Sequence, residues 1–175
     1  VDPAYLEARL NLGLAFKGLG EREAARAAWR TLLHVRPTVA EAWGQLGAMD
    51  LEDGHTGDAI ENLTKAVQLD PKFAAAWATL GSLHAFQYFG GTDHTDERLD
   101  KAKAAIDTAV RLAPDAPEVI ENLGDYYYYG FRDYDRAVEQ YERLAVLRPN
   151  DGVVYGSLAL IHRRQGRFKE AIAEF

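Results

Sequence analysis

The sequence contains no cysteine, which excludes disulfide bonds, thiol nucleophiles and zinc–thiolate centres. It also lacks an apolar run of about 18 residues, the length that a membrane-spanning helix needs. Acidic residues outnumber basic ones by 27 to 20, which disfavours the clustered lysine and arginine of a phosphate-binding surface. We therefore predict no membrane insertion and no nucleic-acid partner. The lack of cysteine fits the cytoplasm and the periplasm alike, and we favour the cytoplasm.

Proline is scarce but regularly spaced. Pro3, Pro37 and Pro71 are 34 residues apart, and Pro114 and Pro149 follow after a further 43 and 35 residues. Proline cannot continue a helix, and it moves the residue before it out of the helical region. A period of this length with a proline closing each unit indicates a tandem repeat of short helices.

Other residues recur in the same register. Small residues come first, at Gly13, Gly47, Gly81 and Gly124, and a second series follows at Ala25, Ala59, Ala102, Ala137 and Ala171. Small side chains allow two helix axes to approach closely, so we place both series where paired helices cross. Large apolar residues at helical spacing, including Trp43, are predicted to fill the core.

This order of residues resembles the tetratricopeptide repeat family over essentially the whole chain. The resemblance implies an all-α fold, a right-handed α-solenoid of helix–turn–helix repeats with four full repeats, a partial fifth and about ten helices. Within each repeat we name the first helix A and the second helix B. We assign residues 1–175 to a single repeat array. Its repeats are placed at 6–39, 40–73, 74–116, 117–151 and 152–175.

Both ends of the sequence stop inside a repeat. Asp2-Pro3 repeats the closing pair Asp70-Pro71, and the last repeat stops before its proline. We therefore expect this chain to be part of a longer protein. The segment 123–147 is similar to repeat arrays attached to bacterial signalling proteins, which favours a bacterial origin.

The third repeat carries about nine extra residues near 86–97, in the turn between its helices. Gly90-Gly91 indicates a turn, and Thr95 before two acidic residues is a plausible helix N-cap. We expect helix A to reach about Phe89 and helix B to begin about a turn early. The aromatic residues of this edge, Phe86, Tyr88, Phe89 and Phe131, either brace the longer hairpin by packing on one another or form a docking patch.

The family resemblance implies that the A helices line a concave groove. The residues assigned to this groove as candidate binding residues are Asn11, Gln45, Asn122, Asp125, Tyr128, Tyr129 and Arg163. An asparagine side chain can both donate to and accept from a peptide bond, so Asn11 and Asn122 are candidates for contacting a partner's backbone. The alternative is that they are ordinary exposed polar residues.

No catalytic, cofactor-binding or metal-binding residues are identified. The five histidines share no ligand spacing, and the segment 93–97 lacks the spacing of a calcium loop. We predict a non-enzymatic scaffold that binds a protein or peptide. Two alternatives stay open: the regulatory or substrate-docking region of a multidomain signalling or glycosyltransferase-type enzyme, and a self-assembling homo-oligomer.

Overall fold

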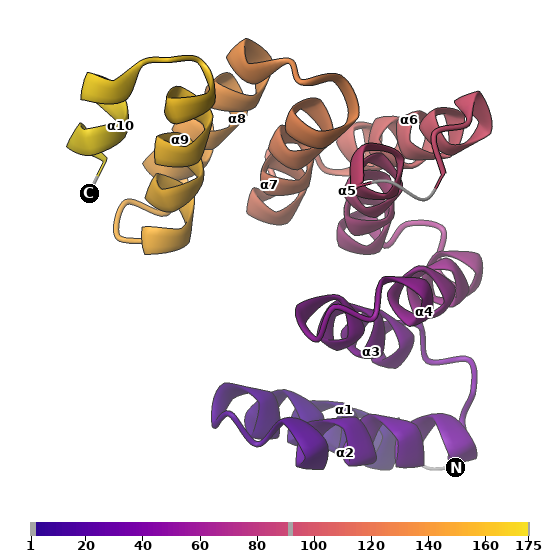
Figure 1. Cartoon of the computed structure of the whole chain (residues 1–175). Helices are drawn as coiled ribbons and strands as arrows, with labels where there is room; N and C mark the ends of the chain where they lie inside the picture. Colours follow the sequence, from indigo (N-terminus) through magenta and orange to yellow (C-terminus); the bar gives the residue numbers. More distant parts are fainter. Residues whose placement is uncertain (1–2, 91–92, 175) are drawn as a thin grey trace. The chain divides into compact units, whose positions relative to one another are not determined.

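The computed structural model describes residues 3–90 and 93–174. Over these residues the backbone forms ten α-helices, one π-helical segment and no β-strand (Figure 1). The prediction of an all-α fold is therefore confirmed. The chain divides into two compact units, 1–76 and 77–175.

Unit 1 contains two helical hairpins. The first pairs α1 (Pro3–Gly18) with α2 (Arg22–Val35), and the second pairs α3 (Ala40–Glu52) with α4 (Thr56–Leu69). Each hairpin turns at a glycine with φ of +79°, Gly20 and Gly54, a conformation that other residues rarely adopt. Trp29, Leu32 and Met49 are fully enclosed and form the centre of the core.

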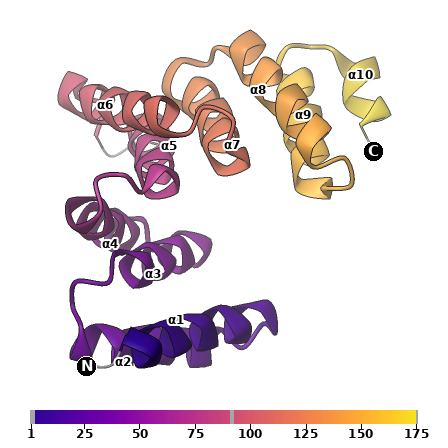
Figure 2. The same cartoon turned by 180° about the vertical axis from the view of Figure 1, so that it is seen from behind.

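Unit 2 contains most of α5 (Ala74–Gly90) together with α6 (Asp96–Leu112), α7 (Pro117–Tyr126), α8 (Tyr134–Leu147), α9 (Gly152–Arg164) and α10 (Phe168–Ala173). In Figure 1, α5, α7 and α9 lie side by side with α6 and α8 behind them, and Figure 2 brings α6 and α8 forward. The A helices of this unit therefore share one face, and α6 and α8 share the other. Ile120, Leu144 and Ile161 are buried where the helices meet.

The longer third hairpin agrees with the sequence-based expectation. Helix α5 extends to Gly90, and α6 begins at Asp96 with Thr95 as its N-cap. The Thr95 side chain accepts a hydrogen bond from the backbone N–H of Arg98, which satisfies one of the open donors at the helix start. Gly91 of the expected turn lies outside the described residues.

Close contact at glycine sets the spacing of each helix pair. A Cβ atom added at Gly47 would lie 3.2 Å from the backbone oxygen of Ala59 and 2.7 Å from Cγ of Leu63. The corresponding atom at Gly81 would lie 3.0 Å from the backbone nitrogen of Ile106, and at Gly124 it would meet the Tyr141 ring at 2.8 Å. Helix A therefore packs directly on helix B at these glycines, as the sequence pattern predicted.

In the fourth repeat, where Pro114 and Pro149 are 35 residues apart, the chain widens into the π-helical segment η1 (Tyr127–Phe131) directly after α7. Arg132 then adopts φ of +52°, which is the left-handed region, and α8 follows. A π-helical turn accommodates an extra residue without ending the helix, so side chains beyond Tyr126 leave the α-helical register.

We predict that replacing Gly47 with alanine destabilises the protein by about 1–3 kcal/mol, because the new methyl group overlaps backbone atoms of α4. Urea unfolding followed by circular dichroism measures this change. Gly156→Ala is the matched control, since a Cβ atom there meets nothing within 4 Å. The control should stabilise the protein by about 0.5–1 kcal/mol through the better helix propensity of alanine. Equal effects of the two substitutions would contradict the close crossing at Gly47.

Candidate functional site

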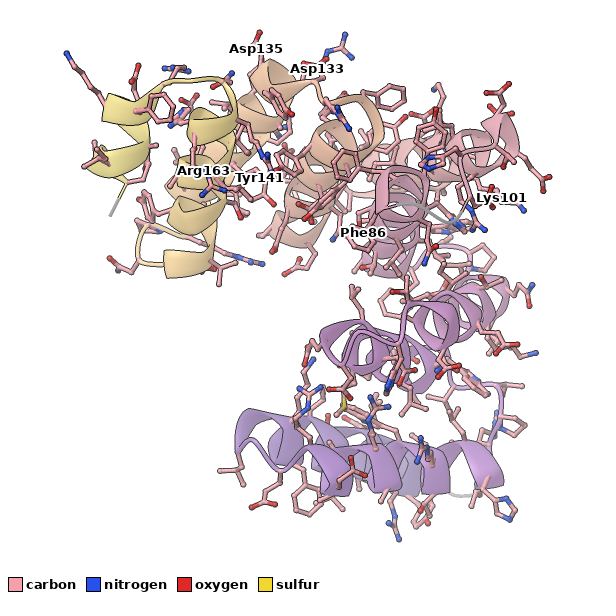
Figure 3. All side chains as sticks on the ribbon, in the orientation of Figure 1. Phe86, Lys101, Asp133, Asp135, Tyr141 and Arg163 are labelled. Atoms are coloured by element: carbon pink, nitrogen blue, oxygen red, sulfur yellow. The ribbon has the colours of Figure 1, made fainter. Side chains whose placement is uncertain are left out.

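The A-helix face of unit 2 carries most of the candidate binding residues. Asn122 and Asp125 lie on α7, Tyr129 lies on η1, and Arg163 lies on α9. Figure 3 shows Phe86 and Arg163 on the side of unit 2 that faces the viewer, which is the side of α5, α7 and α9.

Asn122 is held in a fixed orientation at the middle of this face. Its side-chain oxygen accepts a hydrogen bond of 2.5 Å from the Ser82 hydroxyl on α5, and its amide group donates one of 2.8 Å to the backbone oxygen of Glu118. An asparagine amide has two N–H donors and an oxygen with two lone pairs. One donor and one acceptor position therefore stay available on an oriented side chain.

Asp125 lies one helical turn further along α7 and is linked to α8. The Tyr141 hydroxyl donates a hydrogen bond of 2.7 Å to an oxygen of this carboxylate. Burial raises the pKa of Asp125 to about 6, while the hydrogen bond from Tyr141 acts in the opposite direction and Glu121 adds to the increase. Burial also raises the pKa of the Tyr141 hydroxyl, so this group stays a hydrogen-bond donor near neutral pH.

The remaining acidic groups of α7 are already paired. Arg148, at the end of α8, contacts Glu118 at 2.8 Å and Glu121 at 3.1 Å. Burial raises the pKa of Glu121, and the neighbouring guanidinium of Arg148 counteracts this effect. The negative charge of this part of the face is therefore largely compensated within the protein.

Arg163 is exposed on α9 and forms no ion pair with any described residue. It borders a cleft of about 380 Å³ between α9 and α10, whose other lining residues are apolar. These residues are Gly156, Ala159, Leu160, Phe168, Ala171 and Ile172. Phe168 and Ile172 are 63% and 74% exposed, so an unpaired positive charge stands beside accessible apolar surface.

The aromatic residues at the edge of unit 2 do not form one cluster, because different rings pack on different neighbours. Phe86 and Phe89 on α5 both pack on Tyr129, with ring centroids 5.1 and 5.9 Å apart. The guanidinium of Arg132 lies over the Phe89 ring, 4.9 Å from its centroid. These contacts join the longer hairpin to η1 and leave Phe86 41% and Phe89 38% exposed, so bracing and partial exposure occur together.

Two aromatic residues of the predicted edge lie apart from this cluster. Tyr88 packs on the ring of His94 at 5.6 Å, and Phe131 packs on Tyr126 at 5.1 Å. Phe131 remains 51% exposed. The structure therefore brings together Phe86 and Phe89 with Tyr129, but it does not bring Tyr88 or Phe131 into the same cluster.

Tyr128 does not lie in the groove, where the sequence analysis placed it. It is only 8% exposed and packs on Tyr129 and Tyr134, so it belongs to the core. Its hydroxyl accepts a hydrogen bond of 3.3 Å from Arg164. The physical reason is the π-helical segment, which shifts the side chains of η1 from the α-helical spacing used for the prediction.

In unit 1, the two candidate amides differ in exposure. Asn11 on α1 is exposed, and Gln45 on α3 is half-buried. Neither is held by a hydrogen bond to another described side chain, in contrast to Asn122. Their assignment to a binding surface stays a prediction.

Sequence reasoning missed a buried charged pair in unit 1. Arg26 on α2 is 6% exposed and contacts Asp50 on α3 at 2.5 Å and Asp53 at 2.5 Å. The Asn62 amide on α4 donates a further hydrogen bond of 2.6 Å to Asp50. A signal was present in the sequence, because Asp50 occupies the repeat position that holds Phe16, His84, Tyr127 and His162 in the other repeats.

Within the described residues, no group of three or more histidine and carboxylate side chains could hold a metal ion. Likewise, no helix in the described part of the chain is long and apolar enough to cross a membrane. His84 and His162 are buried among the helices. Burial lowers the pKa of His84 to about 4, and the positive charge of Arg98 adds to this effect.

Three family models, each described as tetratricopeptide repeat, match residues 7–38, 40–73 and 95–151 with 126–175. Among curated proteins, the chain is 28% identical over 97% of its length to protein O-mannosyl-transferase TMTC1 of Mus musculus. It is 26% identical over 80% of its length to anaphase-promoting complex subunit 3 of Schizosaccharomyces pombe. The chain spans about a fifth of these relatives, 17% and 20% of their respective lengths.

A solved structure of a thermophilic protein of the same repeat type, from Thermus thermophilus, superposes with a TM-score of 0.81. The two proteins share 23% identity, and the superposition covers 97% of this chain and 87% of the other. At this level of identity the likeness shows the fold alone.

We predict that Asp125→Asn stabilises the protein at pH 7 by up to about 3 kcal/mol, because the folded state holds an ionised carboxylate whose pKa burial has raised. The folded state binds this proton more tightly than the unfolded state, so the cost of Asp125 is present at pH 7 and disappears as the pH falls through 6 towards 4. The gain from the substitution should therefore vanish near pH 4. Asparagine keeps an oxygen that can accept the Tyr141 hydrogen bond.

Urea unfolding at both pH values measures this difference. Asp100→Asn, at an exposed position on α6, is the control and should change the stability little at either pH. A gain for Asp125→Asn that is equal at pH 7 and pH 4 would show that the carboxylate is not destabilised by burial.

Proposed function

We propose that this chain, which belongs to the tetratricopeptide repeat family, is a protein–protein interaction scaffold and that the A-helix face of unit 2 binds an extended segment of a partner protein. We further propose that this segment carries an acidic side chain next to apolar ones. The anaphase-promoting complex relative is named as a subunit of an assembly, which is in keeping with a scaffold role.

The observation that carries the proposal is the unpaired charge of Arg163 beside an apolar cleft. The carboxylates of Glu118 and Glu121 on this face are compensated by Arg148. Arg163 has no such partner among the described residues. A carboxylate of a bound partner would form an ion pair with it. Guanidinium groups bind carboxylates through two parallel hydrogen bonds, which adds orientation to the attraction.

The apolar part of the segment would enter the cleft between α9 and α10. Leu160, Phe168 and Ile172 line this cleft, and its volume of about 380 Å³ accommodates a large aliphatic or aromatic side chain. Covering the exposed surfaces of Phe168 and Ile172 removes apolar area from water, and this removal is the main source of affinity in most interfaces.

The middle of the face would hold the backbone of the segment. Asn122 is already oriented by Ser82 and by the backbone of Glu118, so binding costs little side-chain entropy. Its free donor and acceptor match the C=O and N–H groups of a peptide bond. A contact of this kind holds a backbone without selecting its sequence, whereas Arg163 and the cleft provide the selectivity.

We propose that the chain itself carries no catalytic activity. One relative is named as an O-mannosyl-transferase, and the chain corresponds to 17% of that protein. A second proposal is therefore that the chain serves as a substrate-docking region within a larger enzyme. In both cases the same face would bind a protein segment.

We predict that wild-type protein prefers an acidic–apolar peptide and that Arg163→Glu reverses this preference. The probes are three fluorescein-labelled octapeptides, each with two leucines next to one variable residue, which is aspartate, asparagine or lysine. Fluorescence anisotropy should show the aspartate peptide binding at least about tenfold more tightly than the asparagine peptide, because a hydrogen-bonded ion pair at this site contributes about 1.5–3 kcal/mol. Arg163→Glu should then favour the lysine peptide.

Arg111→Glu is the matched control, because it makes the same charge change on α6, at the other face of unit 2. It should leave the order of the three peptides unchanged. Equal affinities for the aspartate and asparagine peptides, or an equal effect of Arg111→Glu, would contradict the role of Arg163.

A further inference from the structure

Unit 1 contains a charged cleft that is separate from the face proposed above. It lies between α2 and α4, has a volume of about 500 Å³ and extends down to α3. Its lining residues are Arg26, Arg30, Leu33, His34, Trp43, Leu46, Asp50, Asp58, Glu61 and Asn62. Since α2 and α4 are both B helices, this cleft is not on the A-helix face.

The charged and polar side chains at the floor of the cleft already have partners within the protein. Arg26 and Asp50 are both buried and form an ion pair of 2.5 Å, and Asn62 donates a hydrogen bond to Asp50. A buried pair of this kind leaves little charge to attract a ligand. The floor also explains the open space, because a carboxylate at position 50 fills less volume than the rings at the equivalent positions Phe16 and Tyr127.

The two walls of the cleft carry opposite charges that are not compensated. Arg30 lies on α2, and Asp58 and Glu61 lie on α4. All three side chains are exposed, and none forms an ion pair with any described residue.

An apolar surface lies between the two charged walls. Trp43 is half-buried rather than enclosed in the core, and its indole N–H donates a hydrogen bond of 2.8 Å to the backbone oxygen of Pro37. The ring is thereby fixed, with part of its surface lining the cleft next to Leu33 and Leu46. This finding refines the sequence-based placement of Trp43 in the core.

We propose that this cleft is a second binding site, which accepts a peptide segment carrying one acidic and one basic side chain on either side of an apolar residue. The acidic side chain would contact Arg30, the basic one would contact Glu61, and the apolar residue would cover Trp43. A ligand with a single charge is attracted by one wall and repelled by the other. A ligand with both charges gains from both walls, so the charge pattern of the cleft selects its occupant.

The test uses capped hexapeptides that contain glutamate, leucine and lysine, with one, two or three residues between the two charges. Matched peptides carry glutamine in place of either the glutamate or the lysine. Isothermal titration calorimetry should show at least one doubly charged peptide binding at least about tenfold more tightly than both of its singly charged partners. Amide and indole NMR signals of Arg30, Trp43 and Glu61 should shift on binding, and the affinity should fall with added salt.

Protein variants test which wall residue contacts which charge of the peptide. Glu61→Gln should remove the advantage of the peptide lysine but keep that of the glutamate, and Arg30→Gln should do the reverse. The matched controls are Glu23→Gln and Lys72→Gln, which alter exposed charges of unit 1 outside the cleft. Since all four positions are exposed, circular dichroism should show folded proteins throughout. Arg163→Glu should leave this binding unchanged, so failure here and failure of the unit 2 proposal are distinguishable.

Two results would overturn the proposal. One is equal affinity for doubly and singly charged peptides, or the absence of any binding below millimolar concentration. The other is self-association of the protein without peptide, measured by analytical ultracentrifugation, that Arg30→Gln abolishes. That second result would make another copy of this chain the occupant of the cleft.

Discussion

The direct contact of helix A with helix B at a glycine is the constraint on which the rest of the structure depends. At Gly47 and Gly81 the neighbouring helix backbone lies so close that even a methyl group would overlap it or press against it. This contact fixes the separation of each pair, and the large side chains of helix B then fill the space beside the glycine. Within each unit, neighbouring hairpins bury their apolar sides against one another, so the outer surfaces of the helices stay free for polar and charged residues.

The proposed binding features lie where the repeat pattern changes. In unit 1, the carboxylate of Asp50 takes the place of a packing ring, Arg26 compensates it, and a cleft results. In unit 2, the π-helical segment after α7 turns Tyr128 into the core and leaves Tyr129 to contact Phe86. Departures from an otherwise consistent pattern commonly mark functional positions, and π-helical turns are a known case.

Much of the fold could be predicted from the sequence. The glycine and alanine series and the prolines predicted the paired helices, and Thr95 predicted the start of α6, because these residues act through local backbone geometry. The site was less predictable. Whether Tyr128 is buried, whether Arg148 compensates Glu118, and which charges of unit 1 stay unpaired all depend on contacts between different helices, which the repeat period does not encode. The one signal in the sequence was Asp50, a carboxylate at a repeat position where the other repeats have an aromatic ring or a histidine.

The central claim is that the A-helix face of unit 2 is a binding surface. Site-specific crosslinking tests it most directly, with a photoreactive amino acid in place of Leu160 on α9 or, in a second protein, in place of Ala104 on α6. The account predicts that the aspartate–leucine peptide crosslinks to the protein altered at Leu160 and that excess unlabelled peptide prevents this, while the protein altered at Ala104 gives no crosslink. Crosslinking at Ala104 alone, or equally at both positions, would contradict the account.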